Sequence, residues 1–475
     1  MRPSLNINIH KLVSSPALPV LAAILSVFAV FRTAAHRTPW TDLGTPLLVT
    51  ILWALVVWAA LRYTPYIKRL TAKESGLAGA AVVLVTLAWM DFPSSVFAAS
   101  AAWALLVVIV MSKPSWQLWF NRIGTWWIVA TTAILVISSA AGTMGSRDAA
   151  DAGAPPNLTR TDLPSIYLII PDRFTSPDGL REFGVDLNPF TLELRSLGFF
   201  VPEDMMSSDP ITPESRPVPT TRTLRFLVSI LNEGRDVPVN IPYNTASRLV
   251  KSPETILSLK EMGYEYHNIG SWYAETKAMA IADHNYSYKG YDLMSLMYGS
   301  ELSVAVLDRS VLRELDASPL MRLSHYGVRR DEHMYQLETT LEVASSPRSK
   351  FVMTHLILPH PPFVWNADGG EMPEGLTTEE QYLRQVAFTE GYLLDMVTGI
   401  MSRDPGAVIL IQADEGVLFT HPPDNKGLTE TQWNGVLTAW LVPGVLDEEL
   451  SELDFTDILW FVRDQAVFWG DQDPA

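Results

Sequence analysis

The chain has 475 residues, of which 48% are hydrophobic, with no cysteine and a formal net charge of −17. Without cysteine it has no disulfide, no thiolate metal ligand and no cysteine nucleophile. Nearly all acidic residues follow residue 145, so the negative charge belongs to the C-terminal part and argues against nucleic acid as its partner.

Five apolar segments precede residue 145, at 17–31, 45–61, 76–91, 95–112 and 125–142. Because a membrane-spanning helix needs about 20 apolar residues, they predict a transmembrane domain of about five helices over residues 1–145. Basic residues between the segments number eight on one side (Arg2, Lys11, Arg62, Lys68, Arg69, Lys73, Lys113, Arg122) and three on the other (Arg32, Arg37, Arg147). This asymmetry predicts a multi-pass protein of the cell membrane, with the lipid bilayer as a partner and the C-terminal domain outside the cytoplasm.

Residues 146–162 are small and polar, which is typical of a linker. The stretch Leu163 to Arg173, LPSIYLIIPDR, is apolar and β-branched, and predicts a strand buried on both faces. Four more strands are predicted at 264–269, 350–357, 407–413 and 436–442. Helical patterns lie between them, at 178–198, 223–231, 252–262, 331–345 and 379–402. This alternation predicts a mostly parallel sheet covered on both faces, in an α/β domain over residues 163–475.

Ionisable residues follow three of the predicted strands. Asp172 ends the first strand, Asp414 and Glu415 follow the fourth, and His360 follows the third. Ligand sites in open α/β sheets lie beyond the carboxyl ends of the strands, so these residues predict one functional cluster. The alternative for Asp172 alone is that it caps the next turn.

Thr223 opens an apolar-periodic run, TLRFLVSIL. Threonine is a favoured N-cap, so helix capping is one interpretation. The other is catalytic, because the N-terminus of a helix favours phosphate or sulfate and can support nucleophilic attack by a hydroxyl.

In five stretches the chain resembles membrane-anchored, sulfatase-like members of the alkaline phosphatase superfamily, a group with sulfatases, lipoteichoic acid synthases and phosphoethanolamine transferases. The stretches, in family order, are PSIYLIIPDR at 164–173, RTLRFLVSILN at 222–232, GYEYHNIGSWYAETKAMAIADHN at 263–285, FVMTHLILPHPPFVWNADG at 351–369 and ILIQADEG at 409–416. The resemblance implies a three-layer α/β/α sandwich of alkaline-phosphatase type after the membrane helices.

By the same resemblance, Asp172 and Asp414 match metal-binding acids of the family, and Thr223 matches its nucleophilic hydroxyl. His360 resembles the histidine that contacts the substrate in the transferases. His355, Arg173 and Arg222 are further candidates for substrate binding.

The chain departs from the family pattern in two places. Asp414 is followed by Glu415 where most of the superfamily has histidine. A metal shell of Asp172, Asp414, Glu415 and the Thr223 hydroxyl contains only oxygen, which suits one Mg²⁺, Mn²⁺ or Ca²⁺ ion better than Zn²⁺. The usual Ser-Asn-Tyr before the nucleophile is replaced by Pro219-Thr220-Thr221, so Thr220 and Thr221 are alternative nucleophiles.

The resemblance, together with a threonine nucleophile, implies an enzyme that transfers or hydrolyses a substituted phosphoryl group on an envelope lipid or glycan, with a metal ion. Sulfate-ester hydrolysis is one alternative. The C/S-x-P-x-R motif of true sulfatases is absent, since Ser215-Arg-Pro217-Val-Pro219 has proline where arginine is required. The other alternative is a catalytically inactive receptor or scaffold with the same fold.

Overall fold

The computed structural model describes residues 17–34, 43–63, 83, 163–185, 188–207, 221–232, 237–238, 240–288, 302–303, 306, 319–419 and 427–471. The chain divides into two compact units. Unit 1 comprises residues 1–148 and 290–325, and unit 2 comprises residues 149–289 and 326–475. Unit 2 is therefore discontinuous in sequence, which the amino-acid pattern does not indicate.

In unit 1 the described helices are α2 (Ala17–Ala34) and α3 (Gly44–Tyr63), which pack against each other. They cover the first two predicted membrane segments. The other three, at 76–91 apart from Val83, 95–112 and 125–142, lie outside the described residues. Within the described part of the chain, no helix has both the length and the apolar character needed to cross a membrane.

Residues far apart in sequence share one apolar cluster in unit 1. Leu302 and Val306 are buried together with Val27, Phe28 and Leu43. Part of the later segment, 290–325, therefore packs on the N-terminal helices, to whose unit it belongs.

Unit 2 is built on a six-stranded sheet with the order β3-β2-β4-β1-β5-β6. The strands are β1 (Ile166–Asp172), β2 (Glu265–Ile269), β3 (His284–Tyr286), β4 (Lys350–Pro359), β5 (Val408–Gln412) and β6 (Thr438–Leu441). Every residue of β1, β4 and β5 is buried, as expected for strands covered on both faces. The five strands β1 to β5 run parallel, and β6 pairs antiparallel with β5.

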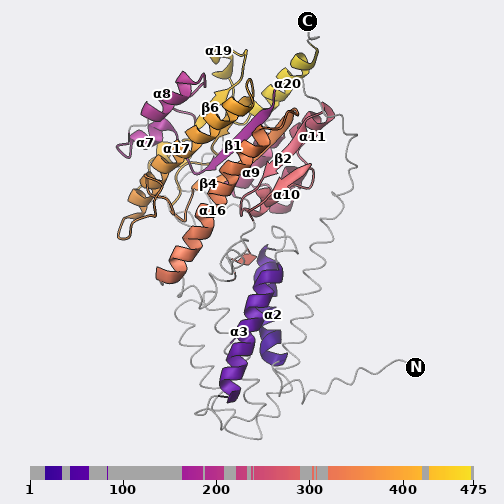
Figure 1. Cartoon of the computed structure of the whole chain (residues 1–475), viewed down its shortest axis with the longest axis vertical. Helices are drawn as coiled ribbons and strands as arrows, with labels where there is room; N and C mark the ends of the chain where they lie inside the picture. The colour runs from indigo at the N-terminus through magenta and orange to yellow at the C-terminus, as the bar shows by residue number, and fades with distance from the viewer. Residues whose placement is uncertain are drawn as a thin grey trace, which may run out of the picture. The chain divides into compact units, whose positions relative to one another are not determined.

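Helices cover the sheet on both sides. In Figure 1 α7 and α8 lie to the left of the strands, and α11 lies to the right of β2. The helices of unit 2 are α7 (Pro177–Arg181), α8 (Asn188–Ser196), α9 (Arg222–Leu231), α10 (Tyr243–Lys251), α11 (Glu254–Glu261), α12 (Ala274–Lys277), α17 (Thr378–Arg403), α18 (Glu430–Asn434), α19 (Asp447–Leu450) and α20 (Ile458–Asp471). Helix α16 (Pro319–Ala344) begins within the last residues assigned to unit 1. The mixed α/β fold predicted for this part of the chain is confirmed.

Two elements differ from the sequence prediction. The single helix predicted for 178–198 is wrong, because α7 ends at Arg181 and Gly184 then takes a φ of +76°, a left-handed conformation that interrupts a helix. Strand β3 was not predicted, because its sequence His-Asn-Tyr is only three residues long and lacks an apolar pattern.

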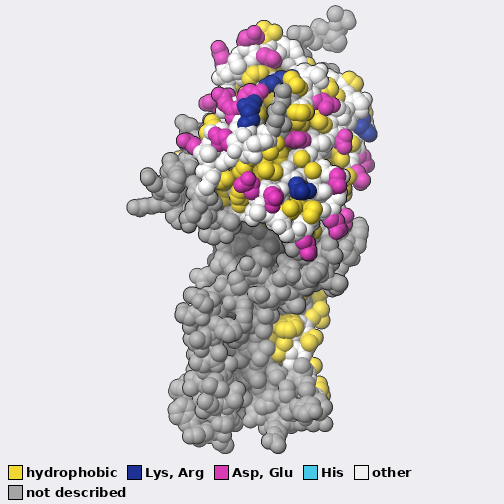
Figure 2. Space-filling view, turned by 90° about the vertical axis from the view of Figure 1, so that its left-hand side faces the viewer, with side chains coloured by type: hydrophobic (Ala, Val, Ile, Leu, Met, Phe, Trp, Pro, Cys, Tyr) yellow, Lys and Arg dark blue, Asp and Glu magenta, His cyan; other side chains and the backbone are white. Residues whose placement is uncertain are grey.

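Acidic side chains are spread over the drawn face of unit 2, with few Lys or Arg side chains among them (Figure 2). Acidic residues are costly to bury without a partner. In the described residues five acids are nevertheless buried, namely Asp172, Glu275, Glu332, Asp414 and Glu415. Three of these five belong to the ends of two neighbouring strands.

Candidate active site

The carboxyl ends of β1, β4 and β5 bring three ionisable side chains together. Asp172 is the last residue of β1, His355 lies within β4, and Asp414 follows β5 by two residues. Their potential ligand atoms all lie within 4.8 Å of one another, and each residue is at most 4% exposed. We call these three residues the strand-end group.

The strand-end group fits a divalent cation by an observation independent of the sequence resemblance. One oxygen of Asp172 (Oδ1), one of Asp414 (Oδ2) and Nε2 of His355 are buried and have no hydrogen-bond partner among the described residues. A buried polar atom without a partner costs roughly 1–3 kcal/mol, and a cation would satisfy all three. The donor set combines imidazole nitrogen with carboxylate oxygen, so it differs from the all-oxygen shell expected from the sequence.

Without a cation, burial disfavours the charged forms of all three side chains of the group. Burial, and then the neighbouring Asp414, raise the pKa of Asp172 well above its usual range. Burial, and then Glu415, raise the pKa of Asp414 to about 7. Burial lowers the pKa of His355 to about 3, so its ring is neutral at pH 7 and keeps a lone pair for a metal ion.

His355 is held in place by residues of the segment after β2. Its Nδ1 lies 2.8 Å from the Thr276 hydroxyl, and the Tyr273 ring meets its imidazole edge-on at 5.6 Å. Metal-binding histidines commonly engage a partner with their second nitrogen, which fixes the orientation of the ring. No sequence signal marks Thr276 or Tyr273, because nothing in their spacing relates them to β4.

Thr223 and Thr221 have separate roles at the start of α9. Thr221 is the N-cap, and its hydroxyl accepts a hydrogen bond from the Leu224 N–H at 3.2 Å. The Thr223 hydroxyl instead lies near the Asp414 carboxylate and opposes the rise in its pKa. Capping therefore does not account for Thr223. The third threonine considered, Thr220, lies outside the described residues.

Glu415 is engaged by arginines and lies outside the strand-end group. Its Oε1 accepts a hydrogen bond from Arg173 Nε at 2.9 Å, and its Oε2 lies 4.0 Å from Arg222 Nε. Arg173 also donates to the Leu418 carbonyl, and Arg222 donates to the Trp433 carbonyl and to Asn434. Both guanidinium groups thus connect the segments that follow the strand ends.

The backbone of Arg173 turns sharply to reach Asp414. Its φ of +66° is left-handed, which costs a non-glycine residue roughly 1–2 kcal/mol. In this conformation the Arg173 N–H donates to Asp414 Oδ1 at 3.1 Å, and the Glu415 N–H donates to the same oxygen at 2.8 Å. The two bonds fix one oxygen of Asp414 and leave the other to the strand-end group.

His360 lies at the same edge of the sheet, because it directly follows Pro359, which is the register partner of Asp172. Its ring is half-buried and meets the Trp272 ring edge-on at 6.1 Å. Arg329 lies over Trp272 at 4.8 Å and pairs with the buried Glu332 at 2.9 Å. Of these side chains, His360 and Trp272 are half-buried, whereas Arg329 and Glu332 are buried.

No family model matches this sequence, and no curated protein matches it. The chain is similar to several solved structures. One is the C-terminal periplasmic domain of EcEptC from Escherichia coli in complex with Zn, which is 13% identical with a TM-score of 0.41. This match covers 64% of the present chain and 82% of the EcEptC chain. The lipoteichoic acid synthase LtaP from Listeria monocytogenes matches at 11% identity, 64% and 72% coverage and a TM-score of 0.39. The lipooligosaccharide phosphoethanolamine transferase A from Neisseria meningitidis, an integral membrane protein, matches at 12% identity, 97% and 81% coverage and a TM-score of 0.34.

Proposed function

We propose that unit 2 transfers or hydrolyses a substituted phosphoryl group through Thr223, with a divalent cation held by Asp172, His355 and Asp414. The observation that carries the proposal is the position of the buried Thr223 hydroxyl near Asp414, a member of the strand-end group, where it opposes the rise in the pKa of that carboxyl. A hydroxyl next to a cation site and in the first turn of a helix is suited to attack a phosphoester. The mixed nitrogen and oxygen donors suit Zn²⁺ or Mn²⁺.

The bound cation would supply positive charge to the phosphoryl oxygens and to the attacking hydroxyl. Thr223 Oγ1 forms the new bond to phosphorus, and the bond from phosphorus to the leaving-group oxygen breaks. The Asp414 carboxylate can accept the hydroxyl proton, because it lies near Thr223. An acceptor hydroxyl or water then displaces Thr223 and completes the transfer or hydrolysis.

The residues around the group have supporting roles. Thr276 holds His355 through its Nδ1, so that Nε2 faces the carboxylates. Glu415 keeps Arg173 and Arg222 in place beside the site. His360 and Trp272 offer a half-buried surface that can contact the group carried by the phosphorus.

We further propose that the N-terminal apolar segments anchor the protein in the cell membrane with unit 2 outside the cytoplasm. The support is the apolar sequence before residue 145 and its eight-to-three asymmetry of flanking basic residues. In that location an envelope lipid or a lipid-linked glycan would be the substrate.

The chain offers a matched pair of threonines for the test. Thr223→Ala should abolish turnover of a chromogenic phosphodiester and remove any covalent phosphoryl-enzyme, whereas Thr223→Ser should retain both. Thr221→Ala is the control: it should lower the free energy of unfolding by about 0.5–2 kcal/mol through loss of the cap and keep turnover. Turnover by Thr223→Ala, or a phosphoryl group trapped on Thr221, would refute the assignment.

A further inference from the structure

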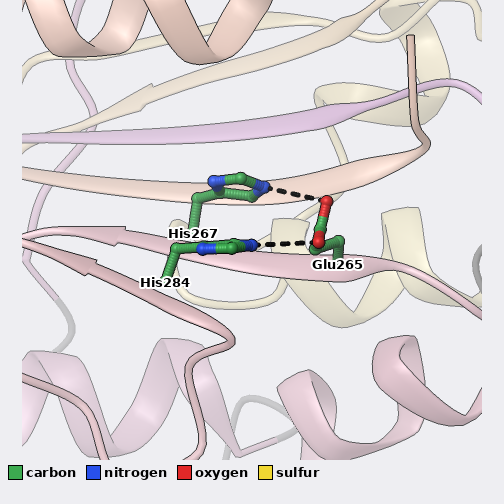
Figure 3. Close-up of side chains that lie close together, drawn as sticks. All are labelled: Glu265, His267 and His284. Carbon is green, nitrogen blue, oxygen red and sulfur yellow. Dashed lines mark hydrogen bonds and ion pairs between the residues drawn. The ribbon is translucent and has the colours of Figure 1, made fainter. Parts of the chain in front are cut away.

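A second group of potential metal ligands lies on the edge strands of the sheet. Strand β3 pairs in parallel with β2, and His284 is the register partner of His267. Glu265 precedes His267 by two residues, and alternate residues of a strand face the same side of a sheet. Glu265, His267 and His284 therefore converge on one face, as Figure 3 shows. We call these three residues the edge cluster.

The distances within the edge cluster match the spacing of ligands around a tetrahedral metal ion. Glu265 Oε2 lies 3.4 Å from His267 Nε2, and Glu265 Oε1 lies 3.0 Å from His284 Nε2. All three ligand atoms lie within 4.8 Å of one another. Zn²⁺ bonds to nitrogen and oxygen of about 2.0–2.1 Å place tetrahedral ligands about 3.3 Å apart. The two glutamate–histidine distances are therefore close to this spacing.

The two imidazole rings are already arranged for coordination. They stack with centroids 4.6 Å apart at 26°, and both direct Nε2 toward the same carboxylate (Figure 3). The other nitrogen of His267, Nδ1, lies 3.2 Å from the Tyr286 hydroxyl, so this ring has the outer partner typical of a metal ligand. The side chains of His267 and Glu265 are 6% and 12% exposed, and that of His284 is 46% exposed. His267 and Glu265 thus form the buried side of the cluster, and His284 forms its exposed side.

The edge cluster is separate from the strand-end group. Glu265 is the first residue of β2 and the register partner of Lys350, the first residue of β4. Asp172 pairs with Pro359 at the other end of β4. The two groups therefore lie toward opposite ends of the parallel strands.

The Arg348 guanidinium competes with a cation at the edge cluster. Arg348 Nη1 lies 3.0 Å from Glu265 Oε1, the oxygen that also faces His284. The Arg348 side chain is 51% exposed, so water can replace the protein contacts that it would lose on moving away. A cation at the cluster must displace this arginine, which gives the arginine a measurable effect on metal affinity.

We propose that the edge cluster is a second metal site, which takes Zn²⁺ through two histidine nitrogens and one carboxylate, with water on the open side. Imidazole together with carboxylate favours Zn²⁺ over Mg²⁺ or Ca²⁺. The ion links β2 to β3, the three-residue strand at the edge of the sheet, and so stabilises that edge. This role is independent of turnover at Thr223.

The test uses the full-length chain carrying Asp414→Asn, so that the strand-end group does not contribute a Zn²⁺ site. After removal of metal with a chelator, Zn²⁺ alone is titrated and followed by calorimetry. The parent should bind one equivalent, and its thermal unfolding temperature should rise with Zn²⁺. His284→Ala removes a direct ligand. Loss of a residue that only orients a ligand already lowers metal affinity by about 10–100-fold, so this variant should bind Zn²⁺ about 100-fold more weakly or worse. Glu342→Gln, which removes a nearby exposed carboxylate outside the cluster, is the control and should leave binding unchanged.

Arg348→Ala is the second variant, and it keeps the test decisive even if a histidine variant fails to fold. It removes the competing charge, so Zn²⁺ should bind more tightly than in the parent. An ordinary pair of histidine–glutamate hydrogen bonds would give the same distances without binding metal. No Zn²⁺ equivalent in the parent, undiminished binding in His284→Ala, or weaker binding in Arg348→Ala would overturn the proposal.

Discussion

Replacing Asp414 by Asn should stabilise the metal-free protein at alkaline pH. Asp414 is buried beside Asp172 and Glu415, and its Oδ2 has no hydrogen-bond partner in the described part of the chain. Asn has the same shape and keeps the Oδ1 that accepts the N–H groups of Arg173 and Glu415. The substitution therefore removes a buried negative charge with little change in packing.

The magnitude follows from the pKa of Asp414, which burial and Glu415 raise from 3.8 to about 7. A group whose pKa is raised on folding stabilises the protein fully below its unfolded pKa, and this contribution is lost as the pH rises through the folded pKa. Each unit of pKa corresponds to about 1.4 kcal/mol. Between pH 5 and pH 8 this group should thus reduce the free energy of unfolding of the metal-free protein by about 2–3 kcal/mol.

The assay is urea unfolding of the wild type and Asp414→Asn in the presence of a chelator, at pH 5 and pH 8. The difference in unfolding free energy between the two proteins should change in favour of Asn by about 2–3 kcal/mol from pH 5 to pH 8. Adding Zn²⁺ at pH 8 should stabilise the wild type more than the variant, in which only the edge cluster remains to bind the ion. An Asn variant that is less stable than the metal-free wild type at pH 8 would refute the reasoning.

Three further predictions test other parts of the structure. Thr276→Val should weaken metal binding at the strand-end group by about 10–100-fold, because His355 loses its orienting partner; equilibrium dialysis measures this, and unchanged affinity would contradict the role of Thr276. Gly416→Ala should destabilise unit 2 by roughly 1–3 kcal/mol, since the new Cβ would lie 2.3 Å from the Trp433 carbonyl oxygen; a urea midpoint equal to that of wild type would show that the backbone yields freely. A reporter that is active only outside the cytoplasm should function when fused to the C terminus, and activity of a cytoplasmic reporter there would disprove the proposed topology.

The sequence predicted the centre of the sheet well and its edges poorly. The long apolar runs of β1, β4 and β5 have one physical explanation, which is burial on both faces, and each was placed within about three residues. Strand β3 carries no such signal, because a three-residue polar strand is defined by its pairing with β2 alone. The antiparallel direction of β6 depends on the path of the preceding chain and has no local signature.

The candidate site shows a similar division. Acids after strands were recognisable because the carboxyl ends of parallel strands meet at one edge. The position of His355 was visible, but the direction of its ring depends on Thr276, which is 79 residues earlier in the chain. The two threonines of α9 differ in role through contacts with Leu224 and with Asp414, and only the three-dimensional arrangement distinguishes them.

The discontinuity of unit 2 affects the order in which the protein can be completed during synthesis. Val27, Phe28 and Leu43 are made early, but Leu302 and Val306, with which they are buried, emerge only after β1 and β2. Unit 1 therefore has to wait for residues encoded between the two halves of unit 2. For the same reason, a shortened protein beginning at residue 149 would keep residues 290–325 without the helices to whose unit they belong. An independently soluble version should instead join residue 289 to residue 326 through a flexible polar linker.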